Sequence, residues 1–225
     1  MPANAKQRDR YWEAASYHLA WCREHDVDVI DGRWDLEDPI SGLLLAAVLA
    51  RSSARPVLNT LCRRSWDRVR VTAAWWPSSL VDLVVNFVAD EVRYMLLLEN
   101  KHLTTNSNQP GYKKLLSEGR RHEILWQTEK TLGEVDRVRA RGGERLLGGP
   151  FDPEAVVLPV LLDAASRTMD EAFPVYEWMT LPHRHDRWSA VSYAELAEGL
   201  RDHYERDLDP LLEPLLAQLF ACAGT

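Results

Sequence analysis

Paired cysteines and long apolar runs are both missing from this sequence. The three cysteines, Cys22, Cys62 and Cys222, lie far apart and none belongs to a CxxC pair. The pattern therefore indicates neither a disulfide framework nor a thiolate zinc site, and we expect reduced, mostly buried thiols. No stretch reaches the roughly 18 apolar residues of a membrane span, and the polar first ten residues lack the apolar segment of a secretory signal. We expect a soluble cytoplasmic protein with no membrane partner.

An excess of positive charge is missing as well. The sequence has 27 Lys and Arg against 34 Asp and Glu, which gives a formal net charge of -7. This balance argues against a protein that coats nucleic acid by bulk attraction, because such binding depends on neutralising phosphates. A local basic groove remains compatible with it. The phosphate-binding loop of ATP motors and the Gly-x-Ser-x-Gly motif of serine hydrolases are also absent.

What the sequence does contain is enough apolar residues for one substantial core. It has 225 residues, of which 46% are hydrophobic. This length is at the upper end of a single domain, so we expect one domain over residues 1–225. Apolar residues at helical spacing predict an N-terminal helix over residues 11–25 and a C-terminal helix over residues 210–223, as additions to the core.

The segment from residue 69 to residue 99 has the β-branched and aromatic composition of strands. We expect three strands in a meander, over residues 69–75, 80–88 and 92–99, with a turn at Asp90-Glu91. The third strand is almost entirely apolar, which predicts a place inside the sheet with both faces covered. The adjacent Trp75 and Trp76 are either core residues or a pair that stacks on a base.

Helices are expected on both sides of this segment. Asp38 and Pro39 open one helix as N-cap and first helical residue, and a shorter helix is expected over residues 55–66. Ser192 and Glu195 form a capping box that starts a later helix. The other expected elements are one or two helices over 109–141, a strand over 155–162, a helix around 165–172 and a strand over 187–191. Together these patterns predict an α/β fold with a central mixed sheet flanked by helices.

The candidate chemistry lies at the open end of the expected hairpin. Counted outward from a two-residue turn at Asp90-Glu91, Asp82 lies opposite Glu99. Side chains alternate along a strand, so Lys101 shares the face of Glu99 and Asn100 points the other way. Three charged groups therefore converge at the end of an otherwise apolar hairpin.

Two ionised carboxylates in a poorly solvated place repel each other unless positive charge stands between them. A hard divalent cation such as Mg²⁺ or Mn²⁺ meets that need. The expected ligands are the carboxylates of Asp82 and Glu99 and the backbone carbonyl of Asn100. Lys101 is expected to orient the attacking water or to stabilise charge on a phosphate. The alternative is a structural cluster of salt bridges in the sheet.

The string of Asp82, a hairpin and then Leu97-Leu98-Glu99-Asn100-Lys101 resembles the signature of the PD-(D/E)xK nuclease superfamily. Val81 stands where that signature has Pro. Upstream, Glu37 followed by Ile40, Ser41 and Leu44 is similar to the first-helix pattern of prokaryotic families of this type. Downstream, the resemblance continues through Gln109 and Tyr112, then Val156 to Leu162, and then Trp188 to Leu196, which reads Trp-x-x-x-Ser-Tyr-x-x-Leu. It spans roughly residues 36 to 205.

The resemblance implies a restriction-endonuclease-like core and a Mg²⁺-dependent phosphodiesterase that cuts DNA, as an endonuclease or exonuclease. Asp82, Glu99, Lys101 and Gln109 would be catalytic, and Glu37 would assist metal binding unless it is a solvated charge. Lys113 and Lys114 are expected along the phosphate path or as ordinary surface charge. Tyr112 and His102 are candidates for substrate contact. The alternatives are a packing role for Tyr112 and an exposed loop position for His102.

The resemblance implies defence against foreign DNA as the usual biological setting, with partner proteins of a defence system. A homodimer is expected because cutting two strands needs two sites. Two alternatives stay open. One is a catalytically inactive protein of the same fold that serves as a nucleic-acid-binding or assembly subunit. The other is an unrelated α/β interaction protein whose charged cluster is structural.

Overall fold

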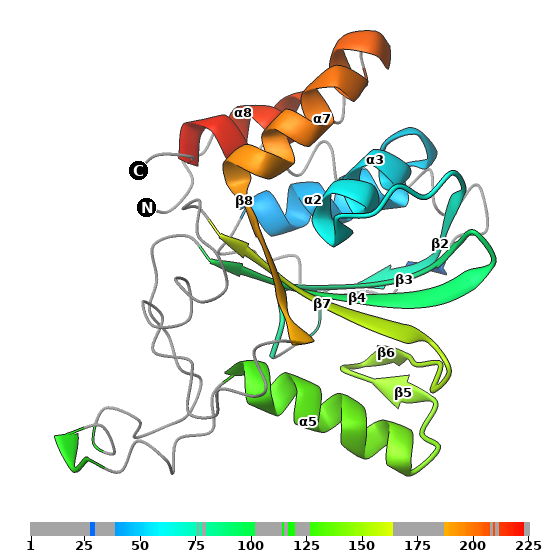
Figure 1. Ribbon diagram of the computed structural model, residues 1–225, viewed down its shortest axis with the longest axis vertical. Coiled ribbons are helices and arrows are strands. Elements are labelled where there is room, and N and C mark those ends of the chain that lie inside the picture. Colours follow the sequence, from blue (N-terminus) through cyan, green and yellow to red (C-terminus); the bar gives the residue numbers. More distant parts are fainter. Residues whose placement is uncertain are drawn as a thin grey trace.

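The structure is a computed structural model and describes residues 28–29, 39–75, 77, 80–101, 114, 117–119, 127–163, 187–207, 209 and 212–222. Within these residues the chain has an α/β fold, with a mixed sheet that has helices on both of its faces (Figure 1). The helices expected over residues 11–25 and around 165–172 lie outside the described residues. So do five candidate site residues: Glu37, His102, Gln109, Tyr112 and Lys113.

The sheet is mixed, as expected from the sequence. Its described part has six strands in the order β1-β2-β3-β4-β7-β8. The strands β2, β3 and β4 form the expected antiparallel meander, whereas β7 is parallel to β4 and β8 to β7. Strand β4 is therefore an inner strand of the sheet. The bounds are β1 (Asp28–Val29), β2 (Val69–Trp75), β3 (Leu83–Ala89), β4 (Val92–Lys101), β7 (Val156–Asp163) and β8 (Ser189–Ser192).

The turn between β3 and β4 is the two-residue turn expected at Asp90-Glu91. Ala89 pairs with Val92, and both turn residues have positive φ, 45° for Asp90 and 72° for Glu91. Positive φ at both positions gives the turn whose twist matches that of the flanking strands. The Asp90 carboxylate accepts the backbone N–H of Arg68 at 3.0 Å. This tight turn fixes the register of the hairpin.

One face of the sheet is covered by four helices, which lie above it in Figure 1. Leu83, Val85, Leu96 and Leu98 of the sheet join their apolar side chains in one buried core. Helix α3 begins and ends four residues earlier than expected, and it ends at Cys62 because Arg63 adopts a left-handed conformation that terminates it. The helices are α2 (Pro39–Leu49), α3 (Arg51–Cys62), α7 (Tyr193–Asp207) and α8 (Leu212–Cys222).

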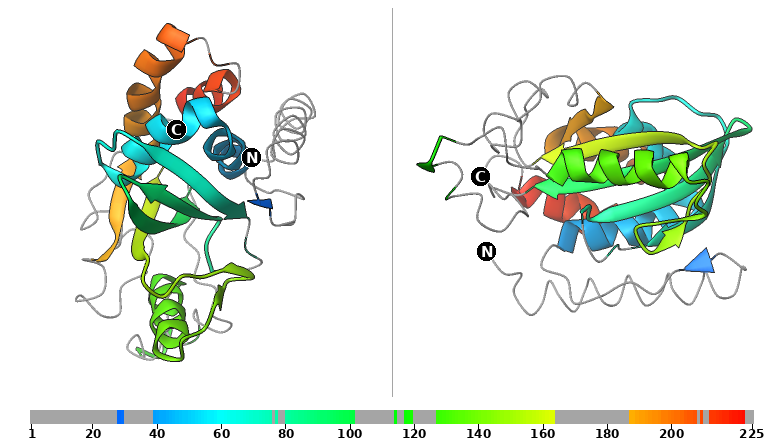
Figure 2. Two further views of the ribbon diagram at one scale, coloured as in Figure 1. Left: turned by 90° about the vertical axis from the view of Figure 1, so that its right-hand side faces the viewer. Right: turned by 90° about the horizontal axis from the view of Figure 1, so that it is seen from below.

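The opposite face is covered by α5 (Gln127–Ala140) and a short hairpin of β5 (Arg145–Leu146) and β6 (Gly149–Pro150), as seen from below in Figure 2. This hairpin is not among the elements expected from the sequence. Trp75 lies under it with 1% of its surface exposed, and its indole N–H donates to the carbonyl of Leu147 at 2.9 Å. Trp75 is therefore a core residue and does not offer a face to a base.

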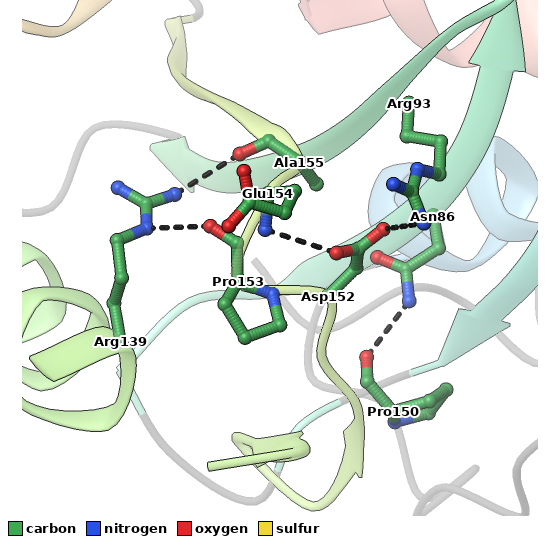
Figure 3. A network of polar contacts seen from close by, with 8 residues as sticks. All are labelled: Asn86, Arg93, Arg139, Pro150, Asp152, Pro153, Glu154 and Ala155. Atoms are coloured by element: carbon green, nitrogen blue, oxygen red, sulfur yellow. Dashed lines mark hydrogen bonds and ion pairs between the residues drawn. The ribbon is translucent and has the colours of Figure 1, made fainter. Parts of the chain in front are cut away.

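A polar network fastens the segment between β6 and β7 to the sheet and to α5 (Figure 3). Asp152 pairs with Arg93 of β4 at 2.7 Å. Asn86 of β3 donates to the carbonyl of Pro150 at 2.8 Å. Arg139 of α5 donates to the carbonyls of Pro153 at 2.9 Å and Ala155 at 3.0 Å. These contacts lie just before β7 begins and help to fix it beside β4.

The capping box at the start of α7 is confirmed. The backbone N–H of Ser192 donates to the Glu195 carboxylate at 2.7 Å, and the N–H of Glu195 donates to the Ser192 hydroxyl at 3.1 Å. Two backbone donors at the helix start are thereby satisfied. None of the helices in the described ranges is long and apolar enough to cross a membrane.

Candidate functional site

The candidate site lies at the C-terminal end of β4. Leu97 belongs to the core on the α5 side of the sheet, and Leu98 belongs to the core under α2, α3, α7 and α8. Because side chains alternate, Glu99 and Lys101 continue the face of Leu97. Asn100 continues the face of Leu98, as the sequence predicted. The site therefore faces the side of the sheet that α5 covers.

Glu99 and Lys101 are in direct contact, with Nζ of Lys101 against Oε1 of Glu99. The Glu99 side chain is 1% exposed and the Lys101 side chain 10%. Removing two charges from water is costly, and their attraction does not always recover that cost. A buried ion pair of this kind need not stabilise the fold, and a functional role is the alternative.

Asp82 reaches the same strand end through its side chain. The ladder between β3 and β4 ends at the pair Leu83–Leu98, one pair short of the expected pair between Asp82 and Glu99. The N–H of Asp82 donates to the Leu98 carbonyl at 2.8 Å, and its carboxylate accepts the N–H of Asn100 at 2.7 Å. The structure thus brings the Asp82 carboxylate to the peptide that joins Glu99 and Asn100.

The segment before Asp82 has an unusual backbone. Leu80 has a φ of 78°, a conformation that costs energy for a residue with a side chain. Its carbonyl accepts a hydrogen bond from the Thr131 hydroxyl of α5 at 3.3 Å. This conformation explains why β3 begins at Leu83 and not at Leu80. Helix α5 therefore contacts the segment that delivers Asp82.

Asp163 is a further acidic residue at this end of the sheet that the sequence reasoning missed. It is the last residue of β7, is 1% exposed and pairs directly with Lys101 of β4 in parallel register. It lies two residues after Leu161, which belongs to the α5-side core, so it shares the face of Lys101. The signal was an apolar strand that ends in an acid, Val160-Leu161-Leu162-Asp163.

Behind the site, Asn100 is held on the other face of the sheet. Its side-chain amide donates to the Ser41 hydroxyl of α2 at 2.9 Å, and its side-chain oxygen accepts the Tyr193 hydroxyl of α7 at 2.7 Å. All three residues are buried. Ser41 and Tyr193 belong to the patterns that carry the family resemblance, but no local pattern in the sequence joins them to Asn100.

The residues present fit a divalent metal in the type of donor that they offer. Asp82 and Glu99 supply carboxylate oxygens and Asn100 a backbone carbonyl, and Mg²⁺ commonly binds through one or two carboxylates while it keeps several waters. The described residues contain no group of three or more His, Cys, Asp and Glu that could hold a metal. The fourth expected ligand, Glu37, lies outside the described residues.

Of the residues expected to contact the substrate, Lys114 is the one that lies within the described part of the chain. Its side chain is 77% exposed, and Nζ lies 3.8 Å from the Glu118 carboxylate. An ion pair as exposed as this contributes little to stability, so Lys114 remains available to a phosphate. The placement of Lys113, Tyr112, His102 and Gln109 relative to β4 is a prediction from the sequence only.

No protein-family model and no curated protein matches the sequence, and no solved structure matches the fold. The function is therefore inferred from the residues at the end of β4 and from the fold that positions them.

Proposed function

We propose that this chain is a metal-dependent nuclease that hydrolyses phosphodiester bonds in DNA, with a PD-(D/E)xK-type site formed by Asp82, Glu99 and Lys101. The observation that supports this most is the burial of Glu99 and Lys101 side by side at the end of an inner strand. Burying charged side chains costs free energy, and proteins commonly retain such buried charges at functional sites. The hydrogen bond from Asn100 to the Asp82 carboxylate adds a second acid at the same strand end.

In this proposal the carboxylates of Asp82 and Glu99 and the carbonyl of Asn100 hold Mg²⁺ or Mn²⁺, with Glu37 as a further ligand. Such an ion, when bound, makes a water more acidic and stabilises negative charge on a phosphate. Lys101 stands beside Glu99, where its ammonium can orient the attacking water or stabilise the charge that grows on the phosphate oxygens. Gln109 would contact the same phosphate.

The test is cleavage of plasmid, linear duplex, single-stranded DNA and RNA in Mg²⁺, Mn²⁺ and EDTA. We expect Glu99→Gln, Lys101→Met and Asp82→Asn each to lower kcat by about 10² to 10³-fold or more, because each removes charge needed in the transition state. Asp136→Asn is the matched control, since Asp136 lies on exposed α5 surface and pairs only with exposed Arg187 among the described contacts. Wild-type cleavage rates in Glu99→Gln would refute the proposal.

DNA as the partner has its own test. Lys113 and Lys114 are proposed to neutralise phosphates, and each lost phosphate contact should reduce the slope of log affinity against log salt by about 1. Charge reversal at both positions is therefore expected to weaken binding and to flatten its salt dependence. An unchanged slope would remove both lysines from the DNA interface. Defence against foreign DNA, with partner proteins, is the biological setting that the family resemblance implies, and a homodimer would supply the two sites that cutting two strands needs.

A second candidate function is favoured by the contact between Glu99 and Lys101 themselves. Since Nζ of Lys101 already neutralises the Glu99 carboxylate, the pair could persist in a protein that has lost catalysis and binds nucleic acid or assembles with partners. In that case Mn²⁺ should leave both the stability and the DNA affinity of the protein unchanged. Binding of Mn²⁺ that Glu99→Gln abolishes would favour the enzyme.

A further inference from the structure

Asn100 lies between the two candidate catalytic residues of β4 but points away from them. Its side-chain amide contacts two hydroxyls, those of Ser41 on α2 and Tyr193 on α7, at 2.9 and 2.7 Å. The exposed fractions of Ser41, Asn100 and Tyr193 are 0%, 5% and 0%. The Tyr193 hydroxyl donates to the amide oxygen, and the amide nitrogen donates to the Ser41 hydroxyl. The group is therefore satisfied in one orientation of the amide.

The main chain of Asn100 is fixed on the side of the site as well. Its backbone N–H donates to the Asp82 carboxylate at 2.7 Å. One residue is thus held by α2, by α7 and by the segment before β3. Because Glu99 and Lys101 are its immediate neighbours and point to the opposite face, any rotation of Asn100 would move both of them and the carbonyl between them.

The stability of the fold alone does not require these three polar residues. The surrounding residues of β4 on this face, Leu96 and Leu98, are apolar and fully buried. Apolar side chains at all three positions would avoid taking an amide and two hydroxyls out of water. A satisfied polar network instead specifies one orientation of the groups in it. Functional side chains depend on such support, because small displacements of reacting groups cost large factors in rate.

We propose that Ser41, Asn100 and Tyr193 form a positioning triad that holds the end of β4, and with it Glu99, Lys101 and the Asn100 carbonyl, in the geometry that metal binding and catalysis need. This inference rests on the proposed nuclease function. The three residues act from behind the sheet and do not touch the substrate. Residues in such supporting positions typically change metal affinity or activity by about 10 to 100-fold when they are replaced.

The experiment removes single hydroxyls, because Asn100→Ala could disturb the fold. Tyr193→Phe and Ser41→Ala each delete one hydrogen bond to Asn100 and keep the packing. Ser53→Ala is the matched control: Ser53 is equally buried on α3, and its hydroxyl bonds to the carbonyl of Ala47 at 2.8 Å. We expect both triad variants to lower kcat by about 10-fold or more with KM nearly unchanged, and to weaken Mn²⁺ binding by a similar factor. Ser53→Ala should lower stability only.

Three results would overturn the inference, and they are distinguishable. If the wild-type protein cleaves DNA and both triad variants have the kcat and the Mn²⁺ affinity of Ser53→Ala, the triad is merely structural. If the wild-type protein neither binds Mn²⁺ nor cleaves, the proposed function fails and the triad's role fails with it. Urea unfolding of each variant confirms that folded protein was compared, and a loss of kcat that simply follows stability in all three variants would also count against positioning.

Discussion

Removal of the Lys101 charge offers a test that separates a metal site from a structural ion pair. Lys101→Met keeps most of the side-chain volume and deletes the ammonium that contacts Glu99. Both side chains are at least nine-tenths buried, so water cannot readily replace the lost contact. Breaking a buried pair by removing one partner typically costs about 3 to 5 kcal/mol. We therefore expect Lys101→Met to lose about that much stability in EDTA.

If the site binds metal, a divalent cation should restore much of the stability that Lys101→Met loses. An ion that binds only the folded state, at a concentration 100 times its Kd, stabilises that state by about 2.7 kcal/mol. The assay is urea unfolding of wild type and Lys101→Met, each with EDTA and with a series of Mg²⁺ or Mn²⁺ concentrations. Adding Glu99→Gln to Lys101→Met should neutralise the Glu99 carboxylate and abolish the effect of the metal.

Arg137→Met provides the control for a lost cation. Arg137 pairs with Glu134 on α5, where the two side chains are 55% and 27% exposed. Exposed pairs contribute about 0 to 1 kcal/mol, so this variant should be nearly as stable as wild type with or without metal. If Mg²⁺ and Mn²⁺ leave the unfolding curves of both wild type and Lys101→Met unchanged, the pair is structural and our reasoning about a metal is wrong.

Three further predictions concern the scaffold. Glu91→Gly should raise stability by about 1 kcal/mol in urea unfolding, because Glu91 has a φ of 72° in a turn that favours glycine; a loss of stability would contradict this. Gly149→Ala should lower stability by about 1 to 3 kcal/mol, since the added Cβ would stand 2.4 Å from the Trp75 ring; an unchanged midpoint would mean that the β5–β6 hairpin shifts freely. Burial raises the pKa of the Cys62 thiol from 9.0 to about 12, so in a variant where it is the sole cysteine we expect iodoacetamide to react slowly near pH 8 until urea unfolds the chain, and fast labelling of the folded protein would refute this. The same shift means that the unfolded chain loses this proton first, so its contribution to stability falls as pH rises from about 9 toward 12.

The parts of the fold that depend on neighbouring residues were predictable from the sequence. The hairpin of β3 and β4 follows from a two-residue turn and flanking strand formers, and its seven pairs have the expected register. The capping box at Ser192 and Glu195 depends on a spacing of three residues, and it was predicted correctly. Side chains alternate along β4, which places Asn100 on the other face of the sheet from Glu99 and Lys101. This follows from strand geometry alone.

The parts that were missed depend on contacts between distant segments. The pairing of Asp163 with Lys101 is set by the crossover through α5 to β7, which local patterns do not determine. The late start of β3 depends on the left-handed Leu80 and its contact with Thr131. The joining of Ser41 and Tyr193 through Asn100 needs the packing of α2 and α7 on one face of the sheet.

The parallel pairing of β4 with β7 has a consequence for the order of folding. The bond between Asp82 and Asn100 spans one hairpin, and hairpins close in about 1 to 10 μs. The partner of Lys101 on β7 arrives only after a long crossover has closed, which is slower because distant segments must first meet. We therefore expect the charges at the end of β4 to stay hydrated until β7 has docked beside it. We expect Lys101→Met to accelerate unfolding and to leave the folding rate nearly unchanged in stopped-flow measurements.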